Sequence, residues 1–148
     1  MEQNELLNQI SSLRDVESCI SEELAKAVDG RDWDSLEVLL WAAICHPCEA
    51  YAPVLERMLH RREPGVPVED LIEVLGEIGS ETSVVHLERA MYWRPEWDEF
   101  HSVAVKCIGA LAAIGNESAK VVVETVSSTA PEVVRDWAAA KLATWPKP

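Results

Sequence analysis

Hydrophobic residues recur about every three to four positions along most of the chain, which is the spacing of amphipathic α-helices. The first stripe consists of Leu6, Leu7, Ile10, Leu13, Ile20, Leu24 and Val28. Gly30 ends this stripe, and Asp34 is expected to cap the next helix. Alternation typical of strands is almost absent, and the valine run "KVVVETV" follows Asn116 and Glu117, a pair typical of a helix start. The pattern predicts an all-α fold.

Two segments of the chain repeat each other 36 residues apart. They are "LGEIGSETSVVHL" at 75–87 and "LAAIGNESAKVVV" at 111–123. Each copy predicts a helix, a turn at Gly79 or Gly115, and a second helix, because glycine takes the left-handed conformation that ends a helix at least cost. A partial copy begins at Pro131, a residue that suits the first turn of a helix. A looser copy lies earlier in the chain, in the segments "SLEVLLWAAI" and "YAPVLERMLHRR".

The motifs "LGEIG-x-E-x-x-V-x-x-L" and "VVRDWAAAKL" resemble those of the HEAT-repeat family, whose members are α-solenoids of stacked antiparallel helical hairpins. Stacking is needed because one hairpin cannot bury its apolar stripe alone. The resemblance covers residues 34–145 and implies a single HEAT-like domain, residues 1–148. Its expected parts are N-terminal capping helices at 1–30, hairpin repeats at 34–62, 67–93 and 97–128, and a C-terminal capping helix at 131–145.

Length and composition favour one ordinary globular domain. The chain has 148 residues, of which 48% are hydrophobic and 26% charged. No segment approaches the roughly 20 apolar residues of a membrane helix. The beginning, "MEQNELLNQI", is acidic and amphipathic, unlike a secretory signal or a transit peptide. A cytoplasmic location is therefore expected.

The net charge of −13 is concentrated in the first two thirds of the chain. Residues 1–100 carry 22 acidic and 8 basic side chains, whereas residues 101–148 carry 4 acidic and 5 basic ones. Such a surface repels nucleic acid and anionic membranes, and it attracts a basic protein partner. The alternative is that the acidity only keeps the protein in solution.

The stretch "ICHPCEAY" contains a Cys-x-x-Cys pair, Cys45 and Cys48. A redox pair works at a helix N-terminus, where the dipole stabilises the thiolate, but Cys45 follows the end of a predicted helix. A zinc site needs two further ligands, and no second pair exists. A corner between helices is the better interpretation. Cys19 and Cys107 lie in apolar helical patterns, so reduced, packed thiols are expected there.

Catalytic signatures are missing from the sequence. It contains no Gly-x-Ser-x-Gly, His-Glu-x-x-His, phosphate-binding loop or dinucleotide-binding glycine pattern. Some HEAT-repeat enzymes bind iron through adjacent His-Glu pairs, but no histidine here precedes a glutamate. We therefore expect no catalytic residue, no metal ligand and no cofactor. An enzyme centred on Cys45 and Cys48 remains as an alternative.

The second helix of each HEAT hairpin lines the concave face of the solenoid, so the polar stripes of these helices are candidate binding residues. Val84, Leu87 and Met91 are expected to point inward. The outward positions are then His86, Arg89 and Trp93 in one unit and Glu56, Arg57 and His60 in the preceding one. The alternative is that these stripes are ordinary solvated faces.

The stretch "MYWRPEWDEF" is the strongest candidate for a partner contact. Exposed aromatics ringed by carboxylates have the composition of a hot spot for a basic protein. Phe100 is expected in the core, and the alternative for the tryptophans is that they cap helix ends. The predicted partner-binding residues are Trp93, Glu96, Trp97, Asp98, Glu99, His86, Arg89, Glu56 and His60.

These features predict a non-enzymatic protein-binding scaffold. The chain looks like the small, acidic HEAT-like immunity proteins of bacteria. That resemblance implies neutralisation of a cognate toxin by direct binding, and the toxin is expected to be basic, as many nucleases are. The alternative is a HEAT-repeat assembly or maturation factor, such as a chromophore-lyase-like subunit.

Overall fold

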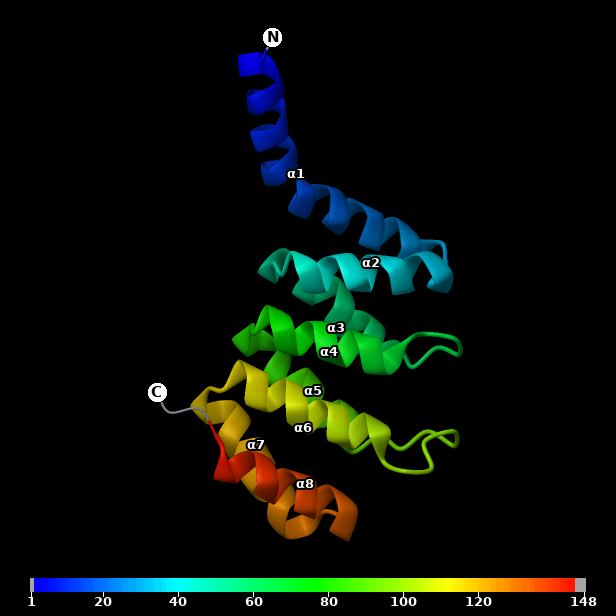
Figure 1. Cartoon of the computed structure of the whole chain (residues 1–148). Coiled ribbons are helices and arrows are strands. Elements are labelled where there is room, and N and C mark those ends of the chain that lie inside the picture. The colour runs from blue at the N-terminus through cyan, green and yellow to red at the C-terminus, as the bar shows by residue number, and fades with distance from the viewer. Residues whose placement is uncertain (1, 146–148) are drawn as a thin grey trace.

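The structure, a computed structural model, describes the backbone of residues 2–145 and the side chains of residues 16–145 (Figure 1). Helices occupy most of this range and no strand occurs in it, so the all-α prediction is confirmed. The elements are α1 (Glu2–Asp29), α2 (Trp33–Cys45), the 3-10 helix η1 (Glu49–Tyr51), α3 (Ala52–Arg61), α4 (Val68–Ile78), the 3-10 helix η2 (Glu81–Ser83), α5 (Val84–Met91), α6 (Ser102–Ile114), α7 (Glu117–Thr129) and α8 (Glu132–Ala143).

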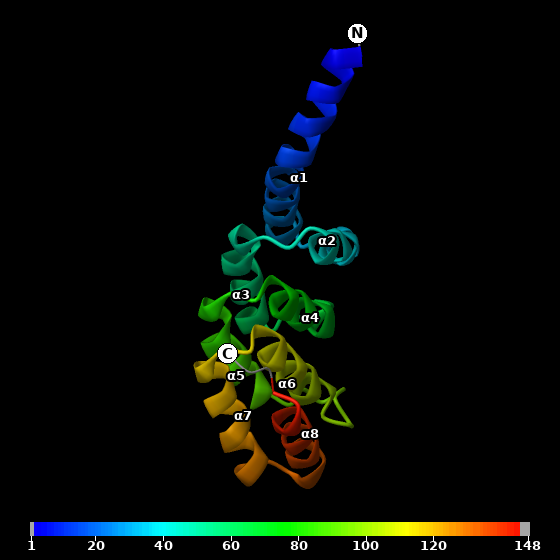
Figure 2. The ribbon, with the colours of Figure 1, turned by 60° about the vertical axis from the view of Figure 1, so that its left-hand side comes forward.

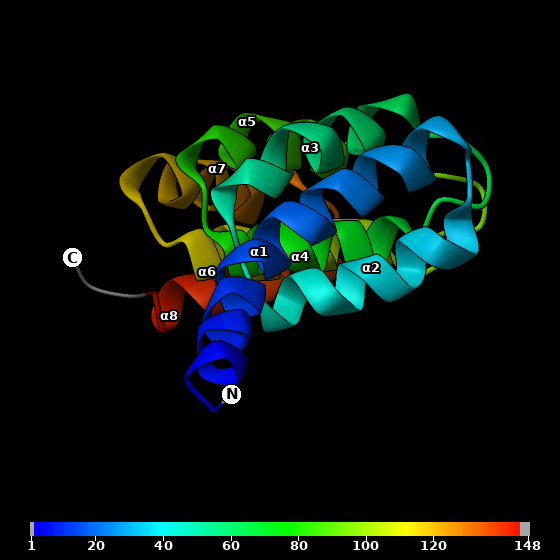
Figure 3. The same ribbon diagram turned by 90° about the horizontal axis from the view of Figure 1, so that it is seen from above.

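The helices after α1 alternate between two layers. One layer holds α2, α4, α6 and α8 in succession, and the other holds α3, α5 and α7 (Figures 2 and 3). The largest contact between helices joins α4 to α6. The second half of α1 covers α2 and α3 at one end of the stack, and its first half extends beyond the stack (Figure 1).

Helix ends follow the predicted chemistry at the repeated glycines. Gly79 and Gly115 have φ values of 73° and 69°, and their N–H groups donate to the carbonyl oxygens of Leu75 and Leu111 at 3.1 and 2.9 Å. Asn116 caps α7, because its Oδ1 accepts a hydrogen bond from the Ala119 N–H at 2.8 Å. The predicted turns at these positions are therefore confirmed.

Two predicted helix starts shift in the structure, and the N-terminal region differs in its number of helices. The cap of α2 is Asp32, whose Oδ1 accepts from the Ser35 N–H at 3.2 Å, so the prediction of Asp34 is wrong. Asp34 is the second residue of α2, so it lies after the cap position, whose side chain accepts from N–H groups two or three residues later in the chain. Pro131 precedes α8 as its cap residue rather than opening it. The single helix α1 occupies the region where more than one capping helix was expected.

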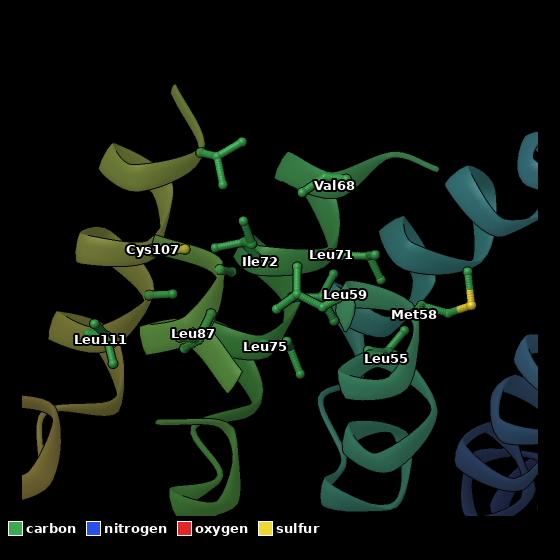
Figure 4. Close-up of a cluster of buried hydrophobic side chains, with 14 of the residues drawn as sticks. Leu55, Met58, Leu59, Val68, Leu71, Ile72, Leu75, Leu87, Cys107 and Leu111 are labelled. Carbon is green, nitrogen blue, oxygen red and sulfur yellow. The ribbon is translucent and has the colours of Figure 1, made fainter. Parts of the chain in front are cut away.

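The core runs without interruption through both layers. Leu55, Met58 and Leu59 of α3 belong to one buried cluster with side chains of α4, α5 and α6 (Figure 4). The inward positions predicted on α5, namely Val84, Leu87 and Met91, are all buried, so that prediction is confirmed. No described helix has both the length and the apolar composition to cross a bilayer.

Gly76 allows α4 and α6 to approach closely. A Cβ atom at this position would lie 2.8 Å from the Cα and 3.0 Å from the Cβ of Ala110. Contacts this short are not tolerated, so the separation of the two helices depends on glycine. The pair fixes the spacing at the centre of the stack.

Three connections lie together at one edge of the molecule: residues 30–32, 62–67 and 92–101 (Figure 1). The first two are joined by an ion pair between Arg31 and Glu63, 3.2 Å from Nη2 to Oε1. The last two are joined by the Arg62 guanidinium, which stacks 4.9 Å from the centre of the Trp93 ring. These contacts give the third connection a defined conformation.

Candidate functional site

The connection of residues 92–101, called the aromatic loop below, presents three large aromatic side chains to solvent. Tyr92 is 61% exposed, Trp97 58% and Phe100 76%. Glu96 and Glu99 are exposed beside them. A surface cluster of aromatic and acidic side chains on one loop has the composition of a protein-binding hot spot.

The expectation that Phe100 belongs to the core is wrong. Helix α6 begins at Ser102, and His101 before it has a left-handed backbone, with φ of 58°. The helical phase that places Val103 and Cys107 in the core therefore does not extend back to Phe100. The left-handed turn directs Phe100 to solvent instead.

Asp98 differs from its acidic neighbours because it is only 3% exposed. Its Oδ1 accepts a hydrogen bond from the Ser102 N–H at 2.6 Å, and its Oδ2 accepts one from the Val103 N–H at 3.1 Å. These are free N–H groups at the start of α6, so Asp98 acts as the cap of this helix. The exposed position expected of Asp98 is therefore wrong, and its role in partner binding stays a prediction.

Further contacts hold the aromatic loop in place. The Arg94 guanidinium donates to the carbonyl oxygens of Asp98 at 3.3 Å and Glu99 at 3.1 Å. Trp93 is half-buried against the core, and its ring meets that of Trp97 edge-on, 6.5 Å between centroids. Trp93 therefore packs at a helix end, in agreement with the alternative prediction for the tryptophans, whereas Trp97 is exposed to solvent.

The other predicted binding residues lie on α3 and α5, and the structure brings several of them together. The Nε2 atom of His60 contacts the Nδ1 atom of His86, and the two ring centroids are 4.6 Å apart. Arg89 lies exposed on α5, one turn after His86. The two outward stripes thus meet as one surface.

Glu56 is buried, with 6% of its surface exposed, so its expected outward position is wrong. Its Oε2 accepts hydrogen bonds from the hydroxyls of Thr82 at 3.0 Å and Ser83 at 2.8 Å, and its Oε1 lies 3.8 Å from His86 Nε2. These partners come from η2 and α5, about one repeat later in the chain. They make burial of the carboxylate possible.

The pKa of His60 lies below its ordinary value. Burial is the main cause, followed by the nearby positive charges of His86, Arg89 and Arg62, and the Glu56 carboxylate opposes these effects. The two rings share one hydrogen bond, which requires at least one neutral imidazole. The pair therefore carries at most one positive charge while the contact lasts.

The Cys-x-x-Cys pair lies at the corner between α2 and η1, as predicted. Cys45 is the last residue of α2 and Cys48 precedes η1, and both are free thiols. Within the described part of the chain, no three His, Cys, Asp or Glu side chains gather as metal ligands do.

The other two cysteines differ in burial. Cys107 is buried, and burial raises the pKa of its thiol. Cys19 is exposed, so the packing expected for Cys19 is wrong.

The sequence analysis missed two exposed aromatic side chains outside the aromatic loop. Trp41 on α2 is 71% exposed and Trp137 on α8 is 48% exposed. Trp41 lies within the nearly continuous apolar run "LEVLLWAAI", so no polar face separates its outward residues from its inward ones. Only the positions of the neighbouring helices reveal its exposure.

No known protein-family model matches this chain, and no curated protein matches it either. A function is therefore inferred from the arrangement of the described side chains. It consists of a braced aromatic loop with two exposed carboxylates and of a histidine pair among arginines on α3 and α5.

Proposed function

We propose that the chain is a non-enzymatic protein-binding scaffold of the cytoplasm, built as a HEAT-like α-solenoid of helical hairpins. Two observations support this architecture. The helices alternate between two layers along the stack, and equivalent helices, α4 and α6, both end in a left-handed glycine, Gly79 and Gly115. A stack of this kind displays the loops and outer helix faces to partners.

The exposure of Tyr92, Trp97 and Phe100 on one braced loop carries the proposal. Leaving three aromatic rings in water forgoes the free energy of their burial, about 25 cal/mol per Å² of apolar surface. A partner that covers them recovers this free energy. The loop is already held by Asp98, Arg94 and Trp93, so little conformational entropy is lost on binding.

The charge of the surface indicates the chemistry of the partner. Glu96 and Glu99 lie exposed beside the aromatic rings, and the whole chain has a net charge of −13. A basic partner is attracted over a distance and then meets complementary charges around an apolar centre. Within this proposal the chain is an immunity protein that neutralises a basic toxin, of the nuclease kind, by direct binding.

The test begins with capture of the partner by the tagged, full chain from its native cells. The expected partner is a basic protein in stoichiometric amount, toxic when expressed alone and harmless when expressed with this chain. Trp97→Ala should weaken binding by about 30-fold, as loss of a hot-spot tryptophan does. Trp137→Ala is the matched control, because Trp137 is exposed on a different element, α8. This variant should bind the partner with the affinity of the unmodified chain.

Two results would contradict the proposal. Equal affinities of the Trp97→Ala variant and the unmodified chain would remove the aromatic loop from the interface. A captured metabolic or pigment-binding protein that is harmless alone would favour the alternative, an assembly or maturation factor such as a chromophore-lyase-like subunit.

A further inference from the structure

The face formed by α3 and α5 carries a cluster of basic side chains on an otherwise acidic protein. We call it the basic patch. It consists of Arg57, His60 and Arg61 of α3 and His86 and Arg89 of α5. The three arginines are exposed, and the histidines are half-buried between the two helices. Contact between the rings of His60 and His86 joins the two helices into one surface.

The positive charge of the basic patch is poorly compensated by the protein itself. The ion pairs among the described side chains that involve lysine or arginine are Lys26–Glu23, Arg31–Glu63 and Lys106–Glu73, so none includes Arg57, Arg61 or Arg89. The carboxylate inside the cluster, Glu56, is buried and accepts the hydroxyl hydrogen bonds of η2. The arginines are therefore available to an external anion.

A groove gives the basic patch room for a ligand. It lies between α1 and α3 and has a volume of about 570 Å³. Val28 and Val54 contribute its apolar wall, and Arg57, His60 and Arg61 line it with Asp29 opposite. A groove with an apolar wall and several donors suits a short extended peptide whose carboxylates face the arginines.

We propose that the basic patch binds a short acidic segment of a partner protein, and that His60 and His86 make this binding stronger as the pH falls. The ligand is defined by its chemistry, a few neighbouring aspartate or glutamate side chains. The proposal is independent of the proposed function, because it rests on α1, α3 and α5 and not on the aromatic loop.

The pH dependence follows from the charges around the histidine pair. Arg89 on α5 and Arg62 after α3 repel a proton on His60, whereas Glu56 on α3 favours one. Asp29 on α1 lines the same groove, and the Thr82 and Ser83 hydroxyls of η2 are bound to Glu56. Incoming carboxylates offset the repulsion from the arginines. They favour the imidazolium form, so binding takes up protons and strengthens on acidification.

The size of the basic patch favours a peptide over nucleic acid or a membrane. Those anions are extended, so they would also face the acidic surfaces that give the chain its net charge of −13. Charges are screened beyond about 8 Å at physiological ionic strength. A short acidic segment therefore interacts mainly with the arginines and the histidine pair of the basic patch.

The experiment measures binding of the full chain to a fluorescently labelled, glutamate-rich peptide by anisotropy. The same peptide with glutamine in place of glutamate is the probe control. We expect the glutamate peptide to bind at least about tenfold more tightly. Its affinity should rise about tenfold from about pH 7.5 to about pH 5.5, the range in which histidine titrates.

Variants locate the site. Replacing Arg57, Arg61 and Arg89 by glutamine should lower the affinity about tenfold or more. The matched control replaces Lys106, Arg135 and Lys141 by glutamine, which changes the net charge equally on α6 and α8 and should leave binding intact. The His60→Gln, His86→Gln double variant should keep binding at about pH 7.5 and lose the increase at lower pH.

Several outcomes would overturn the proposal. Equal binding of the glutamate and glutamine peptides would exclude recognition of carboxylates, and this comparison needs no variant. Equal losses in the arginine variant and its matched control would place binding elsewhere. Tighter binding of a labelled oligonucleotide than of the glutamate peptide would assign the patch to nucleic acid. A pH dependence that survives in the double histidine variant would remove the histidines from the mechanism.

Discussion

At the scale of single residues, Asp98 fixes the start of α6 with two charge-assisted hydrogen bonds. Asp98→Ala leaves the N–H groups of Ser102 and Val103 without this acceptor. We expect the free energy of unfolding to fall by about 1–2 kcal/mol, as for other lost helix caps. Urea unfolding followed by circular dichroism measures the change.

The control for Asp98 is its exposed neighbour Glu99. Surface substitutions away from such contacts change stability by about 0.5 kcal/mol or less, so Glu99→Ala should unfold almost as the unmodified chain does. Equal losses in the two variants would show that Asp98 does not cap α6.

The hydroxyl of Tyr51 is a polar group in the core that lacks a hydrogen-bond partner among the described residues. The side chain is fully buried, and its hydroxyl has no hydrogen-bond partner within the described structure. An unsatisfied buried group destabilises the folded state, so Tyr51→Phe should raise the free energy of unfolding by about 1 kcal/mol. A loss of more than about 1 kcal/mol in thermal or urea unfolding would mean that the hydroxyl does have a partner.

The same tyrosine makes the protein sensitive to alkali. Burial, together with the negative charges of Cys48 and Glu17, raises the pKa of Tyr51 from 10.0 to about 12. The folded state therefore holds the phenol proton more tightly than the unfolded state. Below pH 10.0 the free energy of unfolding keeps this contribution in full. As the pH rises from 10.0 to about 12, the free energy of unfolding falls by up to about 3 kcal/mol. In unfolding measured against pH, Tyr51→Phe should remove this loss.

At the scale of helices, the contact between α4 and α6 depends on Gly76. In Gly76→Ala the new methyl group would meet the Ala110 backbone at 2.8 Å, so the helices must move apart. Overpacking of this kind costs about 1–3 kcal/mol, more than the gain of up to about 1 kcal/mol from helix propensity. We expect a net loss of up to about 2 kcal/mol in urea unfolding.

Gly109, in the facing helix, is the matched control. A Cβ atom at Gly109 meets no atom within 4 Å, so Gly109→Ala changes only the helix propensity. It should raise the free energy of unfolding by about 0.5–1 kcal/mol. If both alanine variants are more stable than the unmodified chain, the close approach of α4 and α6 is wrong.

The all-helical fold, the turns at the repeated glycines and the cap of α7 were predictable from the sequence because their causes are local. Gly79, Gly115 and Asn116 act on backbone groups a few residues away. Glu56 was not predictable, because its hydroxyl partners follow 26 and 27 residues later and reach it only through the fold. The aromatic loop was located by its composition. The separate roles of Trp93 and Trp97 within it depend on Arg62, a residue of another connection.

At the scale of the whole molecule, each helix packs mainly on its neighbours in the stack. Helices α4 and α6 contact helices on both sides, whereas the main contacts of α8 are with α6 and α7. Burial follows the same order, because α4 and α6 each hold several large buried side chains, and α8 holds only Val134 and Ala138. Stability should therefore vary along the stack.

Hydrogen exchange followed by mass spectrometry measures this variation. Opening α8 disrupts a single end of the stack, while opening α4 or α6 separates contacts on two sides, so the terminal helix opens at a lower free energy. We expect amides of α8 to exchange at least about tenfold faster than those of α4 and α6, since about 1.4 kcal/mol in opening free energy gives a factor of ten. Gly76→Ala should reduce the difference by weakening the centre of the stack. Equal protection of α8 and α4 would instead mean that the chain opens as a single cooperative unit.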